Sequence, residues 1–163
     1  MIGIKNRNLS PLVSFDLYLE HYHQLINSLK KEMDVKQISH SIGENLENNI
    51  QTILKQENYD ALVLTGLDQN IVWVNPGFTE MTGYNKKFAL GKKPSFLQGE
   101  KTSQTTLQDI GEQLKRKKRY TGSITNYRKN GETYRCEIKI LPLYNSNKEL
   151  THFIALEKES KAA

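Results

Sequence analysis

Few side chains in this chain are of the types that carry out covalent or metal chemistry, and they are widely spaced. The 163 residues include one cysteine, Cys136, and four histidines: His21, His23, His40 and His152. His21 and His23 are two positions apart, so on a helix they point in different directions, and no cysteine lies beside them. No nucleophile–base pair, phosphate loop or pair of acids stands out. We therefore expect neither an enzyme nor a bound metal ion.

A second set of residues could form a pocket for a small, mostly apolar molecule. Residues 133–144 alternate between apolar and charged side chains, which is typical of a strand with one buried face. Asn126, on the strand before it, would point into the same concavity. The candidate pocket residues are Phe96, Gln98, Asn126, Cys136, Ile138 and Ile140. These residues could equally form an ordinary core that holds no ligand, and both interpretations stay open.

The first third of the chain predicts helices outside this pocket. Apolar residues recur at steps of three and four, at Leu19, Tyr22, Ile26, Leu29 and Met33, and the stripe is widened by Tyr18 and Leu25. Ser14 or Asp16 would cap the start of a helix, with Pro11 outside it. We expect a second helix to begin near Asp34 and Gly43 to mark a bend within it.

From residue 58 the pattern becomes that of strands, with short helices between them. Strands are predicted at residues 61–65, 71–74, 120–128, 133–144 and 150–158, with helical turns at 76–90 and a helix at 103–117. Ser103 would cap that helix, and Asn130-Gly131 predicts a hairpin. This order fits an α+β fold, a five-stranded antiparallel sheet with helices on one face, plus an N-terminal helical extension.

Four motifs in the second part of the chain resemble those of PAS sensor domains. They lie, in order, at residues 72–78 (VWVNPGF), 81–84 (MTGY), 96–99 (FLQG) and 126–131 (NYRKNG). The resemblance covers roughly residues 58–159. It implies an N-terminal helical extension at 1–57, a PAS domain at 58–159 and a C-terminal tail at 160–163.

Residues 91–99 (GKKPSFLQG) more narrowly resemble the flavin-binding light-oxygen-voltage branch of this family. The resemblance places the reactive cysteine of that branch at Pro94 and its phosphate-binding arginine at Ser95. Because proline has no thiol, we expect no covalent flavin photochemistry.

Other positions of the flavin set are also changed. The asparagine before the reactive cysteine falls on Lys93, a strand asparagine falls on Cys136, and the glutamine of the last strand falls on Glu157, whereas Gln98 and Asn126 are kept. An ionised Glu157 could only accept hydrogen bonds, and Cys136 offers only weak ones. We expect no cofactor, with non-covalent flavin binding as the alternative.

Charge and cysteine content limit the location and the partners. The net charge is +5, and the run of residues 115–119 (KRKKR) is interpreted as a solvated helix end, without a nucleic-acid partner. No apolar run reaches the roughly 20 residues of a membrane span, and no signal peptide is recognisable. With a single cysteine, the default prediction is a cytoplasmic location without a membrane partner.

The apolar helical stripe must be buried, either on the sheet of its own chain or against a second copy. PAS domains commonly dimerise through flanking helices, so we expect a homodimer, with a candidate interface at Tyr18, Tyr22, Leu25, Ile26 and Leu29. The sequence ends soon after the last strand. We therefore predict a stand-alone sensory or protein-interaction module in signal transduction that acts in trans on an unnamed signalling partner. Alternatives are a small-molecule or non-covalent flavin sensor and a ligand-free structural dimerisation module.

Overall fold

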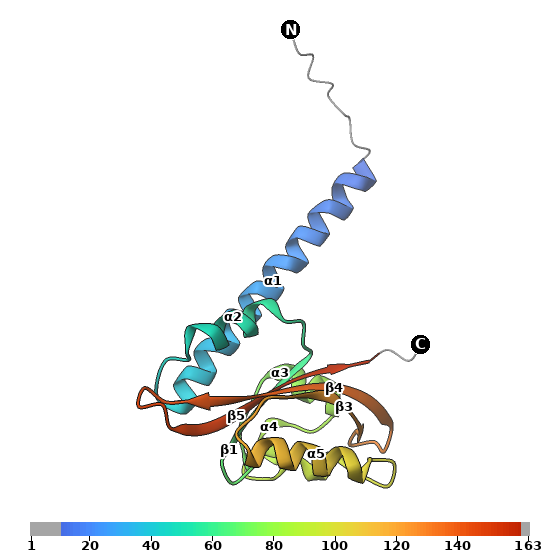
Figure 1. Ribbon diagram of the computed structural model, residues 1–163. Coiled ribbons are helices and arrows are strands. Elements are labelled where there is room, and N and C mark those ends of the chain that lie inside the picture. The colour runs from blue at the N-terminus through green and yellow to red at the C-terminus, as the bar shows by residue number, and fades with distance from the viewer. Residues whose placement is uncertain (1–10, 161–163) are drawn as a thin grey trace.

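The computed structural model describes residues 11–160 and contains one five-stranded antiparallel sheet (Figure 1). The strands are β1 (Ala61–Gly66), β2 (Ile71–Val74), β3 (Tyr120–Tyr127), β4 (Thr133–Tyr144) and β5 (Leu150–Glu159). Their order across the sheet is β2-β1-β5-β4-β3, so the last strand of the chain lies at the centre. The predicted α+β fold with an N-terminal helical extension is confirmed.

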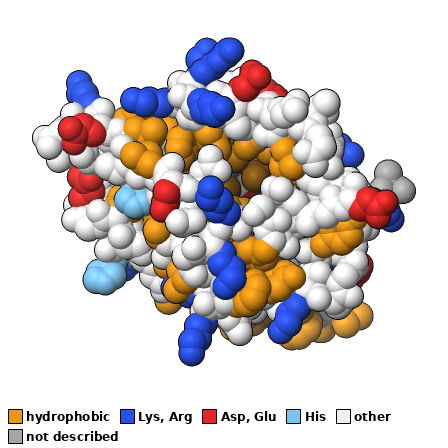
Figure 2. All heavy atoms as spheres, turned by 90° about the horizontal axis from the view of Figure 1, so that it is seen from below, with side chains coloured by type: hydrophobic (Ala, Val, Ile, Leu, Met, Phe, Trp, Pro, Cys, Tyr) orange, Lys and Arg blue, Asp and Glu red, His pale blue; other side chains and the backbone are white. Residues whose placement is uncertain are grey.

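One side of the sheet, which we call the inner face, is covered by short helices from the middle of the chain. They are α3 (Pro76–Thr82), α4 (Lys86–Ala89), the 3-10 turn η1 (Pro94–Leu97) and α5 (Gln104–Lys115). Asn75, Asn85 and Ser103 cap the starts of α3, α4 and α5 by accepting a backbone N–H. Figure 2 shows the molecule from this helical side, with hydrophobic side chains gathered around a recess near its middle.

The register of the strands decides which side chains face inwards. In the β3–β4 hairpin, Asn126 lies opposite Tyr134 and Ile124 opposite Cys136. Between β4 and β5, Ile138 lies opposite Glu157. Because side chains alternate along a strand, this register puts Asn126, Tyr134, Cys136 and Glu157 on the inner face together.

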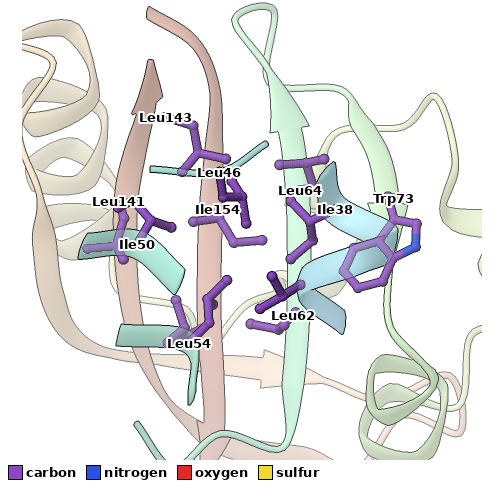
Figure 3. Packing of buried hydrophobic residues seen from close by; sticks show 12 residues of the cluster. Ile38, Leu46, Ile50, Leu54, Leu62, Leu64, Trp73, Leu141, Leu143 and Ile154 are labelled. Carbon is purple, nitrogen blue, oxygen red and sulfur yellow. The ribbon is translucent and has the colours of Figure 1, made fainter. Parts of the chain in front are cut away.

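The outer face of the sheet is covered by the N-terminal helices. The end of α1 (Pro11–Ile42) and all of α2 (Asn48–Gln56) pack across it (Figure 1). Figure 3 shows this cluster, which joins Ile38, Leu46, Ile50 and Leu54 to Leu62, Leu64, Trp73, Leu141, Leu143 and Ile154. Each fully buried aliphatic side chain contributes about 1.5–3 kcal/mol. The extension therefore completes the hydrophobic core in the same chain, which was one of the two ways expected for burying its apolar residues.

Three expectations about the N-terminal helices are wrong. No new helix begins near Asp34, because α1 runs through that residue without a break. The helix ends at Ile42, and Gly43 follows with φ +78°, a left-handed conformation that glycine adopts without the strain of a Cβ. Pro11, expected outside the helix, lies within it.

Asp34 instead links α1 to the domain through a buried hydrogen-bond network. Its Oδ2 accepts from the Tyr59 hydroxyl at 3.1 Å and from the Asn75 side-chain amide at 3.2 Å. The Asn75 Oδ1 in turn accepts the N–H of Leu62 at 2.9 Å and of Phe78 at 3.2 Å. Burial raises the pKa of Asp34 against the opposing effect of these hydrogen bonds. One asparagine side chain therefore joins α1, β1 and the start of α3.

The start of α3 tolerates only glycine at position 77, which provides a test of this arrangement. A Cβ on Gly77 would lie 1.8 Å from the backbone oxygen of Asp60, whereas a Cβ on Gly111 of α5 would meet nothing within 4 Å. Gly77→Ala should lower the free energy of unfolding by about 1–3 kcal/mol through overpacking. Gly111→Ala should raise it by up to about 1 kcal/mol through helix propensity. Urea denaturation of both variants measures the difference, and equal effects of the two substitutions would contradict the close contact.

Candidate functional site

Four polar side chains meet on the inner face of three adjacent strands, and we call them the inner polar cluster. They are Asn126 of β3, Tyr134 and Cys136 of β4, and Glu157 of β5. Their exposed fractions are 5% for Asn126 and Tyr134, 0% for Cys136 and 4% for Glu157. A fully enclosed group of this kind is unusual, because polar side chains are mostly exposed unless they have partners.

The inner polar cluster is surrounded by a hydrophobic shell from the sheet and the covering helices. Its buried members are Ala61, Val63, Ile71, Val74, Phe78, Met81, Ala89, Leu97 and Ile124. Helix α5 covers it less completely, because none of its residues is fully buried and Leu107 and Ile110 are only partly so. The recess in Figure 2 has a hydrophobic floor. This side of the domain therefore combines an apolar lining with a few enclosed polar groups, as small-molecule sites do.

One polar atom of the cluster, Glu157 Oε2, is buried without a hydrogen-bond partner. Leaving such a group unpaired costs about 1–3 kcal/mol. The Tyr134 hydroxyl lies beside the Asn126 side chain, and hydrogen bonding to Asn126 opposes the rise in its pKa. Among residues 11–160, no lysine, arginine or histidine forms an ion pair with Glu157. The site therefore contains hydrogen-bonding capacity that the protein itself does not use.

Burial controls the protonation of the cluster. It raises the pKa of Glu157 to about 7, so this carboxyl group titrates near neutral pH. It also raises the pKa of Tyr134 and of Cys136, and the nearby Glu157 charge adds to both shifts. The Cys136 thiol consequently stays protonated at neutral pH and is a poor nucleophile.

Arg128 closes one end of the site. Its guanidinium donates to the backbone oxygen of Met81 at the end of α3 and pairs with Glu159 of β5 at 2.5 Å. It also lies 4.5 Å from the centre of the Tyr134 ring. Arg128 therefore holds the inner helices, the central strand and one member of the cluster together.

The residues expected to line a pocket are placed as follows. Asn126, Cys136, Ile138 and Ile140 lie on the inner face as predicted. Phe96 packs against the edge of the shell, with its ring centre 5.0 Å from that of Tyr84. Gln98 follows η1 and is half-buried, and among the described residues its side chain makes no hydrogen bond to the cluster. Whether these residues bind a ligand remains a prediction.

Two members of the cluster were absent from the expected pocket set. Tyr134 could have been included, because the alternation of residues 133–144 already puts it on the same face as Cys136. Glu157 follows an apolar run at 153–156 that is buried on both faces, so the sequence pattern does not reveal which way Glu157 points.

A second surface lies on the part of α1 that projects beyond the sheet (Figure 1). Its apolar residues follow an uninterrupted seven-residue repeat with alternating steps of three and four. We call them the α1 seam: Leu12, Phe15, Leu19, Tyr22, Ile26, Leu29 and Met33. Tyr22 is 49% exposed and Leu29 48%, and the flanking Tyr18 and Leu25 are 67% and 53% exposed. This spacing is typical of helices that pair in a coiled coil.

Comparison with known proteins agrees with the fold and the motifs. Residues 60–159 match the model of the PAS domain family, which is more than half of the chain. The chain belongs to the PAS family.

Curated relatives of this PAS chain include light receptors and a regulator. The chain is 34% identical over 112 residues to a blue-light photoreceptor of Listeria innocua, which covers 66% of this chain and 44% of the relative. It is 30% identical over 99 residues to a nitrogen fixation regulatory protein of Klebsiella oxytoca, and the match covers 61% of this chain and 20% of the relative. A blue-light-activated histidine kinase of Brucella canis is 34% identical over 88 residues, covering 54% and 18%. The PAS chain thus spans less than half the length of these relatives.

Solved structures show the same fold. The light-state structure of the light-oxygen-voltage (LOV) domain of the photoreceptor aureochrome 1 has a TM-score of 0.61 at 24% identity, covering 63% of this chain and 83% of that one. The LOV domain of a blue-light-activated histidine kinase from Erythrobacter litoralis has a TM-score of 0.59 at 24% identity, covering 66% and 100%. The PAS domain of this chain therefore has the fold of these LOV domains.

Two further findings concern the described residues alone. None of the helices within residues 11–160 combines the length and the hydrophobicity that a membrane span requires. Over the same residues, no three histidine, cysteine, aspartate or glutamate side chains lie close enough together to hold a metal ion.

The residues present do not fit the flavin of the LOV branch. The resemblance of residues 91–99 puts Pro94, the first residue of η1, at the position of the reactive thiol and Ser95 at that of the phosphate-binding arginine. On the inner face, the enclosed Glu157 carboxyl group has an oxygen without a hydrogen-bond partner and would face the acceptor-rich side of the ring. An ionised Glu157 would repel an acceptor of the ring, and desolvation prevents water from relieving that repulsion.

The raised pKa of Glu157 makes stability depend on pH. Its folded pKa of about 7 lies above the ordinary value of 4.5, so the unfolded chain loses this proton first. The free energy of unfolding should therefore fall as pH rises from about 4.5 to 7, by roughly 3 kcal/mol in total for this group. Tyr134 and Cys136, which face Glu157 from β4, stay neutral over this range. Chemical denaturation of the protein and of Glu157→Gln should give curves that diverge across this range, because the difference isolates Glu157 from the other groups. Parallel curves would show that Glu157 is solvated.

Proposed function

We propose that this PAS chain is a sensory module that signals through contacts with other protein chains, without flavin–cysteine photochemistry. The observation that carries the proposal is the chemistry around η1. The resemblance puts Pro94 at the position of the reactive thiol, and Cys136, the one cysteine of the chain, is enclosed on β4 with a raised pKa. Neither residue can supply the thiolate that a covalent adduct needs.

Absorbance spectroscopy tests this proposal. We expect the purified protein to lack the blue absorbance band of flavin and to release no flavin on denaturation. After incubation with flavin mononucleotide, illumination with blue light should not bleach any band reversibly, because no thiol adduct forms. Reversible bleaching in this protein, as in a photoreceptor carrying the cysteine, would overturn the proposal.

The α1 seam supports a second copy of this chain as one partner. The seam extends over three seven-residue repeats and stops at Met33, next to the residues of α1 that are buried on their own domain. Residues 11–33 of a helix span about 34 Å, enough for a short two-stranded coiled coil. The apolar Tyr18 and Leu25 beside the seam would widen the contact. Four of the five residues expected to form the dimer interface, Tyr18, Tyr22, Leu25 and Leu29, are exposed, which supports the proposal.

Substitutions on opposite sides of α1 test the dimer. Leu29→Arg puts a charge in the seam and should shift the protein from dimer to monomer at micromolar concentration, because a buried unpaired charge is costly. Gln24→Arg puts the same charge on the opposite side of the helix and should leave the dimer intact. Light scattering coupled to gel filtration measures both masses. A single-chain mass for the unmodified protein would exclude the seam as a self-association surface.

Asp34 and Asn75 supply a connection between these two regions. Asn75 caps α3, whose Phe78 and Met81 belong to the shell of the inner polar cluster, and its amide donates to Asp34 of α1. A ligand that moves α3 would therefore change the hydrogen bonds at the base of the seam helix. This gives a physical route by which the state of the inner face could alter contacts between chains.

The unpaired Glu157 oxygen of the cluster favours a small-molecule sensor over a ligand-free dimerisation module. A purely structural core gains nothing from an enclosed carboxyl group without a partner, and an apolar side chain of similar volume would be more stable there. We propose that the pocket alternative, including Asn126, Cys136, Ile138 and Ile140, describes the sensory site. A cytoplasmic location and an output in trans remain parts of the proposal.

A further inference from the structure

The feature without a structural explanation is the enclosed carboxyl group of Glu157. Its Oε2 has no hydrogen-bond partner, and no cationic side chain among residues 11–160 pairs with it. The nearest arginine in the site, Arg128, is already engaged by Met81 and Glu159. An enclosed carboxyl group normally has several hydrogen-bond donors or a cation beside it. Glu157 is therefore a binding group for which the described chain provides no partner.

Two of the inward side chains next to Glu157 are small, although Ile138 lies opposite it on β4. On β1 the residue opposite Glu157 is Ala61, and on β5 itself the previous inward residue is Ala155. Cys136, also on the inner face, is the smallest inward residue of its part of β4. Above them, α5 contributes only partly buried residues, and Figure 2 shows a recess on this helical side of the molecule. A flat molecule could lie on this floor if α5 moved outward slightly.

The hydrogen-bonding groups of the cluster specify what such a molecule must carry. In its ionised form Glu157 only accepts hydrogen bonds, and Asn126 and the Tyr134 hydroxyl can each donate or accept. The ligand end at Glu157 must therefore bring N–H donors, and a positive charge there would be matched by the carboxylate. The rest of the ligand must be apolar to suit the shell of aliphatic and aromatic side chains. An anionic ligand would be repelled at the same point.

Resting on the proposed sensory function, we infer that the inner face binds a small aromatic cation, an amidine or a protonated amino-heterocycle, whose N–H groups pair with Glu157. The cation forms a charge-assisted hydrogen-bonded pair with the carboxylate, as arginine does elsewhere in proteins. The apolar ring rests on Ala61, Ala155 and Cys136, beneath α5. Binding requires an ionised Glu157, so the ligand lowers the pKa of this group towards its ordinary value.

Three probes with the same ring and different charges test the inference. Benzamidine carries the cationic donor pair, benzamide is its neutral counterpart and benzoate is the anion. Each is titrated into the full chain while amide chemical shifts are followed by NMR. We expect benzamidine to perturb residues around Asn126, Tyr134, Cys136 and Glu157. It should bind at least about tenfold more tightly than benzamide, a difference of about 1.4 kcal/mol, and benzoate should not bind.

Two matched variants assign the preference to one carboxyl group. Glu157→Gln removes the charge and should abolish the preference for benzamidine over benzamide. Glu137→Gln makes the same change on the outward side of β4 and should keep that preference. In the unmodified protein, carboxyl-carbon NMR should show that benzamidine lowers the pKa of Glu157, a readout that does not depend on the folding of any variant.

The outcomes are decisive. Three results would each overturn the inference. They are equal affinity for benzamidine and benzamide, a preference for benzamidine that survives Glu157→Gln, and no chemical-shift change at the inner polar cluster up to the solubility limit of benzamidine. The last result would mean that water alone meets the carboxyl group. None of these results would contradict the proposed function, a PAS sensory module without flavin–cysteine photochemistry. A reversible light-induced adduct, in contrast, would overturn the proposed function without changing the order of affinity of benzamidine, benzamide and benzoate.

Discussion

The position of β5 at the centre of the sheet constrains the rest of the molecule. This strand pairs with β1 on one side and β4 on the other, and buries side chains on both of its faces. Ile154 and Leu156 need an apolar cover on the outer face, and Phe153 and Ala155 need one on the inner face. Two layers of helices are therefore required. The inner layer comes from the PAS domain itself, and the outer layer comes from the N-terminal extension, so residues 34–56 are structural parts of the sheet's core.

Much of the fold could be predicted because its signals are local. The alternation of residues 133–144, the Asn130-Gly131 turn and the caps at Asn75 and Ser103 each depend on a few neighbouring residues, and all are found in the structure. The end of α1 was misplaced because Asp34 resembles a capping residue in sequence. In the structure its carboxylate is used by Tyr59 and Asn75, which are distant in sequence, so no local pattern could reveal it.

Only the part of the candidate site that depends on local sequence patterns could be predicted. Asn126, Cys136, Ile138 and Ile140 lie on strands with a clear period of two, and their inward direction followed from it. Glu157 lies on a strand that is buried on both sides, where the period of two disappears and only the register with Ala61 and Ile138 shows its direction. The residue with the most unusual electrostatic environment was therefore the one whose orientation required three-dimensional information.

The continuity of α1 through Asp34 has a mechanical consequence. Because the 32-residue helix has no break at the point where it leaves the sheet, its base and its projecting part move as one rigid rod. The projecting part is about 34 Å long, so a tilt of about ten degrees at the base would displace the far end by about 6 Å. A tilt of that size at the base beside Asn75 would thus become a displacement larger than the rise of one helical turn. A neighbouring chain on the α1 seam would experience it as a change of spacing.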